Sequence, residues 1–451
     1  KNLDLLTEMK FPENTYKNKK NRVLLSHLNI ELPLVKFDAM LAKYLISTTE
    51  DNKISTIARL FDVGHLATDE EIFGKGTKLA LPDDEILFDH LARKIRVLAR
   101  AKEKMMAELI ENEQEHLLSD MELPLAEVLA KMEITGISVS QNTLEEIGAE
   151  NEEKLALLTR EIYELAGEEF NINSPKQLGV ILFEKLQLPV GKKTKTGYST
   201  AVDVLEDLAA LSPVVAKILE YRQINKVQST YVKGLIPQIA DDGKIHTRYV
   251  QDLTQTGRLS SVDPNLQNIP VRLEEGRKIR KAFVPSQDSL LLSSDYSQIE
   301  LRVLAHISAD EHLIDAFKHG ADIHTSTSMR VFGIEKAEDV TANDRRNAKA
   351  VNFGVVYGIS DFGLARNLGI TRKDAKNYIE TYFERYPGIK TYMENIVREA
   401  RDKGFVETMS HRRRKIPDIN ARNFNVRGFA ERTAINSPIQ GSAADILKIA
   451  M

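Results

Sequence analysis

The stretch at residues 290–302, LLLSSDYSQIELR, constrains this chain more than any other part of the sequence. It begins with three consecutive leucines, a short apolar run that is typical of a buried strand. Beyond Ser297 the apolar residues recur at helical spacing, which predicts a helix with one apolar face. Asp295 lies between the two, where a strand would leave the core. This arrangement would present a rigid carboxylate to a metal ion, although an isolated Asp here would be an ordinary surface residue.

A second stretch, residues 341–358 with the sequence TANDRRNAKAVNFGVVYG, predicts a helix with an ordered stripe of side chains. Thr341 and Asp344 form a capping-box pattern at its start, and a glycine ends it. Positions four apart fall on one side of a helix, and they hold two cations and then two aromatic residues. They are Arg345, Lys349, Phe353 and Tyr357. This order suits a nucleotide whose phosphates meet the cations and whose base meets the rings.

Together the two stretches resemble the bacterial family A DNA polymerases. Motif A of the family is matched by Asp295, Tyr296, Ser297, Gln298, Ile299 and Glu300, and motif B by Arg345, Lys349, Phe353, Tyr357 and Gly358. The resemblance runs from about residue 121 to residue 451 and is weaker before that. It implies an α+β multidomain fold, in which a right-hand polymerase of palm, thumb and fingers follows a 3′–5′ exonuclease-like domain of the RNase H type.

The resemblance also implies domain boundaries. Residues 1–111 correspond to the exonuclease-like domain, 112–137 and 238–297 to the palm, 138–237 to the thumb, and 298–451 to the fingers with the helix that leads back to the palm. Motif C of the family, a His-Asp-Glu turn, has no counterpart after Gln440. We therefore expect either that the polypeptide continues beyond this sequence or that it is a truncated, non-catalytic DNA-binding fragment.

Composition places the chain among cytoplasmic proteins. Its 451 residues are too many for one ordinary core, and it has no Cys, which excludes disulfides and Cys-ligated zinc. No apolar run is long enough for a transmembrane helix, so no membrane partner is expected. The net charge is −4, but residues 251–451 hold 30 Lys and Arg against 26 Asp and Glu, whereas residues 1–250 hold 32 against 40. This modest shift favours DNA contacts in the second half.

The first domain is predicted to lack proofreading activity. By resemblance, an active exonuclease needs carboxylates that hold two metal ions, including a late Tyr and Asp on a helix. The segment at residues 90–102, HLARKIRVLARAK, is basic and contains neither residue. Asp38 matches an internal Asp of the family. The family also places an Asp-x-Glu pair on an early strand. The two Asp-x-Glu pairs of this chain, at Asp69 and Asp83, lie instead in turn-like sequence and in the wrong order along the chain.

Several polar and basic residues are predicted to contact primer-template DNA. In the thumb, Lys226, Ser229 and Thr230 suit phosphate contacts, as do the loop lysines Lys192, Lys193 and Lys195, although each could be an ordinary solvated side chain. Amide and hydroxyl groups after residue 254 suit the minor groove, where every correct base pair offers similar acceptors. The resemblance adds further contacts near the primer end and the template. The predicted residues are Arg258, Asn265, Gln267, Asn268, Arg432, Asn436 and Gln440. Arg412, in the basic run at residues 411–415, is predicted to contact template phosphates, although this run could be a solvated turn.

The resemblance assigns the reaction and its participants. Deoxynucleotides are added to a primer 3′ end by two-metal nucleotidyl transfer, in DNA replication and repair. Asp295 and the Tyr296 carbonyl hold two Mg²⁺ ions, with Mn²⁺ as an alternative. Arg345 and Lys349 hold the triphosphate, and Lys349 is also suited to protonate the leaving group. The remaining nucleotide contacts are Ser297, Gln298 and Ile299 of motif A, Glu300 as a block to a ribose 2′-hydroxyl, His324 at the phosphates, Phe353 at the sugar and base, and Tyr357 beside the insertion site.

Three alternatives remain open from the sequence. A single-subunit RNA polymerase shares the Arg/Lys helix followed by Tyr-Gly, but Glu300 and Phe353 argue against it. A non-enzymatic DNA-binding module is favoured by the missing motif C. An active exonuclease is disfavoured by the basic segment at residues 90–102. The chain is expected to be a monomer.

Overall fold

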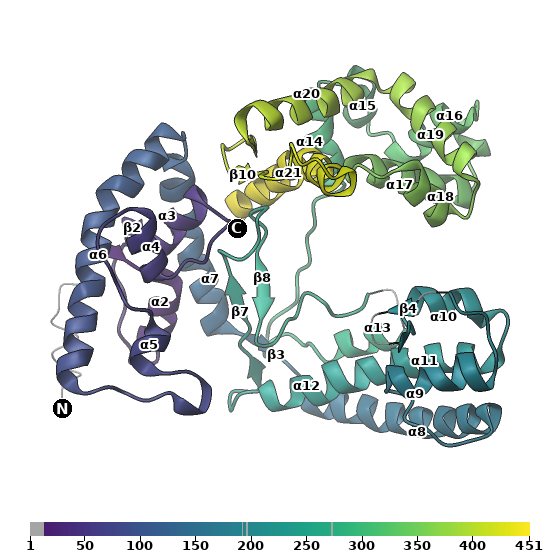
Figure 1. Cartoon of the computed structure of the whole chain (residues 1–451), viewed down its shortest axis with the longest axis horizontal. Coiled ribbons are helices and arrows are strands. Elements are labelled where there is room, and N and C mark those ends of the chain that lie inside the picture. Colours follow the sequence, from purple (N-terminus) through teal and green to yellow (C-terminus); the bar gives the residue numbers. More distant parts are fainter. Residues whose placement is uncertain (1–12, 192, 195–196, 272–273) are drawn as a thin grey trace. The chain divides into compact units, whose positions relative to one another are not determined.

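The computed structural model describes residues 13–191, 193–194, 197–271 and 274–451. Contacts between Cα atoms divide the chain into two units, each built from segments far apart in sequence. The first unit comprises Lys1–Lys131, Val250–Ser260 and Ser294–Met451, and the second comprises Met132–Tyr249 and Ser261–Ser293. The described strands are two or three residues long and form two-stranded sheets, so helices supply most of the packing (Figure 1).

The amino-terminal part of the first unit packs short helices against one long helix. Its apolar core is formed by α3, α4 and the inner face of α6, where Val97, Ala101, Met105 and Leu109 are buried at helical spacing. Its elements are β1 Asn14–Thr15, α2 Asn18–Ser26, β2 Phe37–Asp38, α3 Ala39–Ile46, α4 Ile54–Leu60, α5 Asp69–Phe73, η1 Gly76–Lys78, α6 Asp84–Glu111 and η2 Leu117–Glu122, and α7 Leu123–Thr135 follows across the boundary to the second unit.

The carboxyl-terminal part of the first unit is a group of helices with one hairpin. Tyr382 and Tyr386 are fully buried in its core, with their ring centroids 4.8 Å apart. Its elements are α14 Ile299–Ser308, α15 Glu311–Lys318, α16 Ile323–Phe332, η6 Ala337–Asp339, α17 Ala342–Val356, α18 Asp361–Leu368, α19 Arg372–Arg385, α20 Pro387–Lys403, β9 Phe405–Glu407, β10 Arg413–Lys415 and α21 Phe424–Ala450. The strands β9 and β10 pair antiparallel, and α20 and α21 cover the hairpin.

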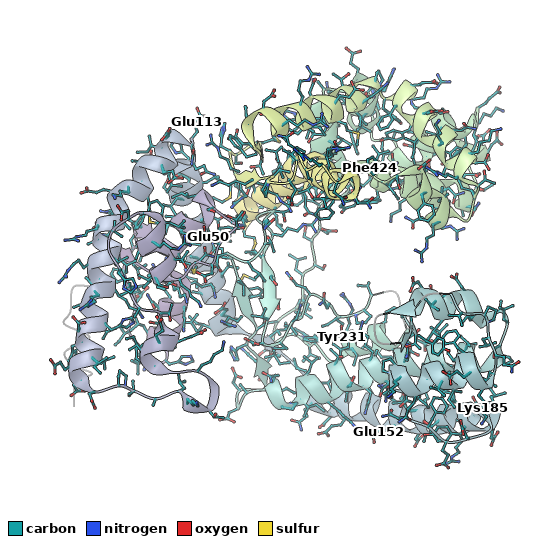
Figure 2. All side chains as sticks on the ribbon, viewed as in Figure 1. Glu50, Glu113, Glu152, Lys185, Tyr231 and Phe424 are labelled. Atoms are coloured by element: carbon teal, nitrogen blue, oxygen red, sulfur yellow. The ribbon has the colours of Figure 1, made fainter. Side chains whose placement is uncertain are left out.

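The second unit is organised around two long helices that lie side by side, α8 Gln141–Ala166 and α11 Pro213–Val227 (Figure 1). Tyr231, labelled in Figure 2, is buried in its core. Its hydroxyl donates to the Asn268 carbonyl. Its other elements are β3 Ile137–Ser138, α9 Pro175–Gly179, η3 Val180–Lys185, β4 Lys193–Thr194, β5 Gly197–Tyr198, α10 Val202–Ala209, η4 Gln228–Val232, α12 Lys233–Leu235, η5 Ile236–Gln238, β6 Lys244–Ile245 and α13 Glu274–Lys281; β7 Arg248–Val250 and β8 Ser260–Val262 lie at its boundary.

The expected strand before motif A is absent. Leu290, Leu291 and Leu292 are 93%, 57% and 94% exposed and lie in irregular backbone. A strand requires a hydrogen-bonded partner, and none of the strands in the described part of the chain pairs with this run. The prediction of a buried strand here was therefore wrong, and Asp295 does not stand at a strand end.

Two helices depart from what their local sequence favours. Residues 22–28 lie in and just beyond α2 and form no strand, and α21 continues through Pro438. The Ser437 hydroxyl donates to the Thr433 carbonyl at 2.5 Å, so side-chain bonding accompanies the proline inside the helix.

Asp38 explains why α2 is a helix. Its carboxylate is fully buried and accepts from the backbone N–H groups of Lys17 and Asn18 at the start of α2. It also accepts from Met40 and Leu41 at the start of α3, so one side chain caps two helices. Burial raises the pKa of Asp38 to about 6, and the four N–H groups oppose that rise.

We expect Asp38→Ala to lower the free energy of unfolding by about 2 to 4 kcal/mol, because two caps are lost and four N–H groups lose their acceptor. Urea denaturation of the variant and the wild type measures the change. Asp89→Ala is the matched control, since Asp89 forms an exposed pair with Arg93 that should contribute less than about 1 kcal/mol. Equal midpoints for Asp38→Ala and the control would contradict the capping role.

Candidate active site

Two residues from separate parts of the sequence, Arg258 and Tyr357, meet at the carboxylate of Glu300. Glu300 is buried in the first turn of α14, where one carboxylate oxygen accepts from the Arg258 guanidinium and the other from the Tyr357 hydroxyl at 3.1 Å. Burial raises the pKa of Tyr357, and the negative charge of Glu300 adds to the effect. The hydroxyl therefore stays protonated and donates at neutral pH. This convergence joins the predicted minor-groove residue, the predicted ribose gate and the end of motif B.

Motif A approaches this point through irregular backbone. Asp295, Tyr296 and Ser297 are exposed, and Gln298 adopts a left-handed conformation with φ of 56° just before α14 begins at Ile299. The change of direction at Gln298 leaves Asp295 accessible to solvent while Glu300 turns into the interior. Asp295 is thus free to meet a ligand from solution.

Motif B forms α17 as the sequence predicts. The capping box between Thr341 and Asp344 is present, and Tyr357 ends the helix before Gly358. Arg345 and Lys349 are exposed, and Phe353 is half-buried. The Lys349 ammonium lies 5.8 Å from the centre of the Phe353 ring. The helix therefore presents two cations and then two rings in the expected order.

An acidic partner of Arg345 was missed by the sequence analysis. Asp322, which also caps α16, accepts from Nε of Arg345 at 2.6 Å and from Nη2 at 3.2 Å. Burial alone would raise the pKa of Asp322, but the hydrogen bonds and charge of Arg345 hold it at about 2. This forked contact fixes the plane of the guanidinium. No spacing rule links positions 322 and 345. The one sequence feature that pointed to Asp322 was its place two residues before His324.

His324 lies beneath the surface and not among the exposed cations. It is 3% exposed, and its Nδ1 is 3.0 Å from the amide nitrogen of Asn352, whose carbonyl oxygen accepts from Thr327. Burial lowers the pKa of His324, so the ring is neutral at pH 7. The phosphate contact of His324 stays a prediction.

A pocket of about 520 Å³ opens beside the aromatic half of motif B. Its lining includes Phe353 and Gly354 of α17, Tyr357 just after that helix, Asn367 of α18 and Arg432 of α21. It is large enough for a flat ring system and combines apolar walls with amide and guanidinium groups. The predicted base contacts therefore border a space that a base could enter.

Comparison with known proteins identifies the family of this site. The sequence profile of DNA polymerase family A matches residues 141–451. The chain belongs to DNA polymerase family A. It is 99% identical over 451 residues to DNA polymerase I of Lactococcus lactis subsp. cremoris, and 70% identical over 439 residues to DNA polymerase I of Streptococcus pneumoniae. These matches cover 51% and 50% of the two relatives, so the chain spans about half their length.

A solved structure and a second profile agree with the fold class. The polymerase domain of Pol1 from M. smegmatis, solved in complex with a DNA primer-template and dNTP, matches with a TM-score of 0.86 and 36% identity over 96% of this chain and 74% of that chain. The profile of the DNA polymerase I ribonuclease H-like domain matches residues 3–101. The α+β multidomain fold, with a right-hand polymerase after an RNase H-type exonuclease-like domain, is therefore confirmed.

The other predicted DNA contacts of the family A chain lie at several surfaces. In the second unit, Lys226, Ser229 and Thr230 are exposed on neighbouring turns at the end of α11 and in η4. Asn265, Gln267 and Asn268 are exposed in the loop after β8. Lys192, Lys195 and the side chain of Lys193 lie outside the described part of the chain. In the first unit, Arg432, Asn436 and Gln440 follow one another at four-residue spacing along α21, and Arg432 is the exposed one.

Arg412 does not reach the surface. The sequence analysis assigned it to DNA, but it is 4% exposed and forms ion pairs with Glu122 at 2.5 Å and Asp445 at 2.8 Å. A guanidinium enclosed between two buried carboxylates is not available to a phosphate. Arg412 is therefore removed from the predicted DNA contacts.

The acidic side chains of the exonuclease-like part have local partners. Asp69 pairs with His90 and Lys94, and Glu71 closes a capping box on Thr68. Nowhere in residues 13–191, 193–194, 197–271 and 274–451 do three or more His, Asp or Glu side chains gather closely enough to hold a metal ion. Over the same residues, each helix is too short or too polar to cross a membrane.

Proposed function

We propose that this chain contributes a DNA-directed DNA polymerase activity, in which deoxynucleotides are added to a primer 3′ end. The observation that carries the proposal is the meeting of Arg258, Glu300 and Tyr357 beside the exposed cations of α17. A primer-end residue, a ribose gate and an insertion-site ring must be adjacent in a polymerase. In a protein that only binds duplex DNA they need not be.

The side chains of α17 have separate tasks in this proposal. Arg345 and Lys349 bind the triphosphate, and Asp322 keeps the Arg345 fork oriented before the nucleotide arrives. Phe353 and Tyr357 meet the sugar and base next to the 520 Å³ pocket. Lys349 is suited to donate a proton to the pyrophosphate leaving group. Movement of α17 over a correct base pair would complete the site.

A divalent metal requirement belongs to the same proposal, with Mg²⁺ as the expected ion and Mn²⁺ as the alternative. Asp295 is exposed and offers a carboxylate, and the Tyr296 carbonyl is a further oxygen donor. Two ions need more ligands than these, and the described residues hold no group of three acidic or histidine side chains around Asp295. The residues present therefore form part of a two-metal site.

We also propose that the exonuclease-like part does not proofread, because Asp38 caps two helices and Asp69 and Glu71 have local partners. A monomer in the bacterial cytoplasm, working in replication and repair on primer-template DNA and deoxynucleoside triphosphates, completes the proposal. The names of the bacterial relatives support the DNA polymerase part of this proposal.

Primer extension tests the proposed function. The chain is incubated with primer-template, Mg²⁺ and four deoxynucleotides, and a primer ending in a dideoxynucleotide serves as control. Extension of the ordinary primer alone supports the polymerase. Primer-template binding without extension would instead support a non-catalytic DNA-binding polypeptide, and absence of both would refute the proposal.

Glu300→Ala is expected to raise ribonucleotide use relative to deoxynucleotide use by about 10-fold to 100-fold, because a buried carboxylate no longer blocks the 2′-hydroxyl. The ratio of the two incorporation efficiencies is measured, so that a general loss from freeing Arg258 and Tyr357 cancels. Glu311→Ala, at an exposed carboxylate in α15, is the control. An unchanged ratio would show that Glu300 is not the gate.

A further inference from the structure

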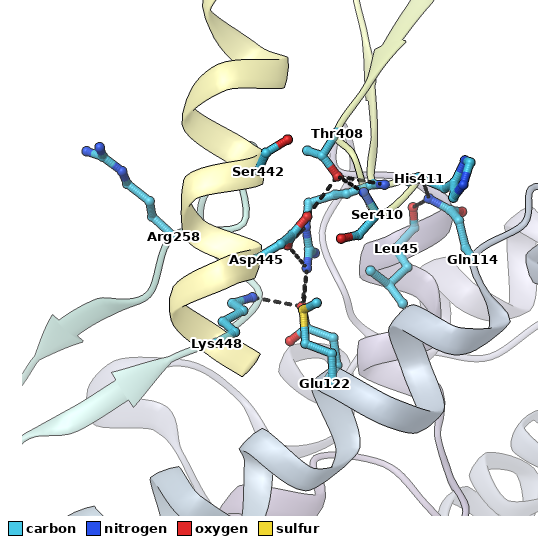
Figure 3. A network of polar contacts seen from close by, with 12 residues as sticks. Leu45, Gln114, Glu122, Arg258, Thr408, Ser410, His411, Ser442, Asp445 and Lys448 are labelled. Carbon is cyan, nitrogen blue, oxygen red and sulfur yellow. Dashed lines mark hydrogen bonds and ion pairs between the residues drawn. The ribbon is translucent and has the colours of Figure 1, made fainter. Parts of the chain in front are cut away.

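Four buried charges join distant parts of the first unit. Glu122 at the end of η2 accepts from Arg412 at 2.5 Å and from Lys448 at 2.7 Å, and Asp445 accepts from Nε of Arg412 at 2.8 Å (Figure 3). All four side chains are at most 5% exposed. The two negative and two positive charges balance. We call this set the buried charge cluster.

Arg412 is the member that connects the two carboxylates. Its Nε binds Asp445 of α21, and its Nη2 binds Glu122, which is 290 residues earlier in the chain. A planar guanidinium can make these two bonds at once in a fixed geometry, whereas a lysine ammonium is a single point charge on a flexible stem. The loop between β9 and β10 holds Arg412 in place. The Thr408 hydroxyl accepts from the backbone N–H of Arg412 and donates to the Asp445 carboxylate.

The cluster lies directly beneath the turn that carries Arg258. At Gly257, where φ is +83°, a Cβ atom would come within 2.7 Å of Nε of Arg412. The backbone at Gly257 therefore packs directly against the Arg412 guanidinium, with no room for a side chain between them. At Gly441 of α21, a Cβ atom would lie 2.5 Å from Thr408 and 3.3 Å from the Thr256 carbonyl.

Further bonds hold the rest of this turn. The Tyr44 hydroxyl donates to the Thr254 carbonyl at 2.6 Å, and the Thr254 hydroxyl donates to the Arg258 carbonyl at 2.7 Å. Gln251, just before the turn, donates to both the carbonyl and the carboxylate of Glu122. The backbone on both sides of Arg258 is thus fixed by groups in contact with the buried charge cluster.

We propose that Arg412 is a positioning residue for the primer-end contacts. It sets the separation between the Thr254–Arg258 turn and α21, and so places Arg258 and Gln440 for the same minor groove. The idea rests on the proposed function for its DNA contacts, but the positioning itself is a property of the protein alone. The two parts can therefore be tested separately.

The first test needs no DNA. Hydrogen exchange is followed by mass spectrometry in peptides that contain Gly257 and Arg258, in the wild type, Arg412→Lys and Arg413→Lys. Arg413 is the matched control, because it is the next residue of the same hairpin but pairs with Glu407. Exchange in the turn should be about tenfold faster in Arg412→Lys only. The lysine keeps the positive charge but cannot bind Asp445 and Glu122 at once in the fixed geometry of the guanidinium. Equal exchange in all three proteins would overturn the proposal.

The second test asks whether the positioning reaches the DNA. Binding is measured with a primer-template whose primer-terminal purine carries carbon in place of N3, beside the unmodified duplex. The wild type should lose about tenfold in affinity, because the Arg258 guanidinium loses an acceptor. In Arg412→Lys the modification should change affinity less than about twofold, because the contact is already displaced. An equal penalty in both proteins would mean that Arg412 supports only general stability.

Gly257→Ala covers the case in which Arg412→Lys does not fold. The added methyl would stand 2.7 Å from Nε of Arg412, so the turn and the guanidinium must separate while all four charges of the cluster are kept. The variant should abolish the penalty of the modified purine, with some loss of urea stability because φ is +83° at this position. A retained penalty in this variant would overturn the proposal. If the wild type shows no penalty, the assignment of Arg258 to the minor groove fails, and the exchange experiment still decides the positioning role.

Discussion

Asp295→Ala is expected to lower the rate of nucleotide addition at least about 10³-fold, while affinity for primer-template stays within about twofold of wild type. Asp295 is the exposed acid of motif A, and it lies on the chain five residues before the buried Glu300. A carboxylate that binds a metal ion during the reaction contributes mainly to the transition state. Its loss should therefore appear in the rate and not in DNA binding.

Single-turnover extension with saturating nucleotide measures this rate, and fluorescence anisotropy measures binding. Asp339→Ala provides the control, because Asp339 is an exposed acid in η6 outside both motifs. Mn²⁺ in place of Mg²⁺ should not rescue Asp295→Ala, since the variant lacks the oxygen ligand for either ion. Extension by Asp295→Ala at a rate near that of the control would remove Asp295 from the site.

The sequence predicted the parts of the site that depend on neighbouring residues. The capping box of Thr341 and Asp344 and the length of α17 are local patterns, and both are present. The family and fold class followed from motifs A and B. The functional roles given to these side chains stay predictions.

Long-range contacts decided the features that the sequence could not predict. The bond from Tyr357 to Glu300 and the fork from Arg345 to Asp322 join residues 57 and 23 positions apart. The helix α2 depends on Asp38, 20 residues after Asn18. The triple leucine at residues 290–292 has the composition of a strand, but a strand forms only with a partner, and composition does not report whether one is present.

Arg412 illustrates the same limit for charge. A run of four basic residues at 412–415 is typical of a solvated or phosphate-binding surface. The residues of this run differ in burial and in partners. Arg412 and Arg413 pair with different carboxylates, whereas Lys415 is exposed. The acids that neutralise Arg412 lie at positions 122 and 445. Their arrangement shows why a basic run is weak support for a nucleic-acid contact until its partners are known.

Glu122→Ala is expected to lower the free energy of unfolding by about 3 to 5 kcal/mol, because Arg412 and Lys448 would stay buried with Asp445 as their one carboxylate partner in the cluster. Urea denaturation at pH 7 measures the loss. Glu127→Ala is the matched control on the following helix, since the pair of Glu127 with Arg22 is partly exposed and should contribute about 1 kcal/mol or less. Equal losses in the two variants would contradict a stabilising role for the buried charge cluster.

The pH dependence gives an independent check on Glu122. Burial alone would raise its pKa, but the charges of Lys448 and Arg412 outweigh burial and lower the pKa from 4.5 to about 2. Because the folded-state pKa is the lower one, the stabilisation is complete above pH 4.5 and is lost as the pH falls toward 2. It amounts to about 3 kcal/mol over that window. Glu122→Gln should remove this part of the acid sensitivity, so wild type and variant should converge in stability as the pH falls; parallel curves from pH 6 to pH 2.5 would mean that the Glu122 carboxylate titrates normally in the folded protein.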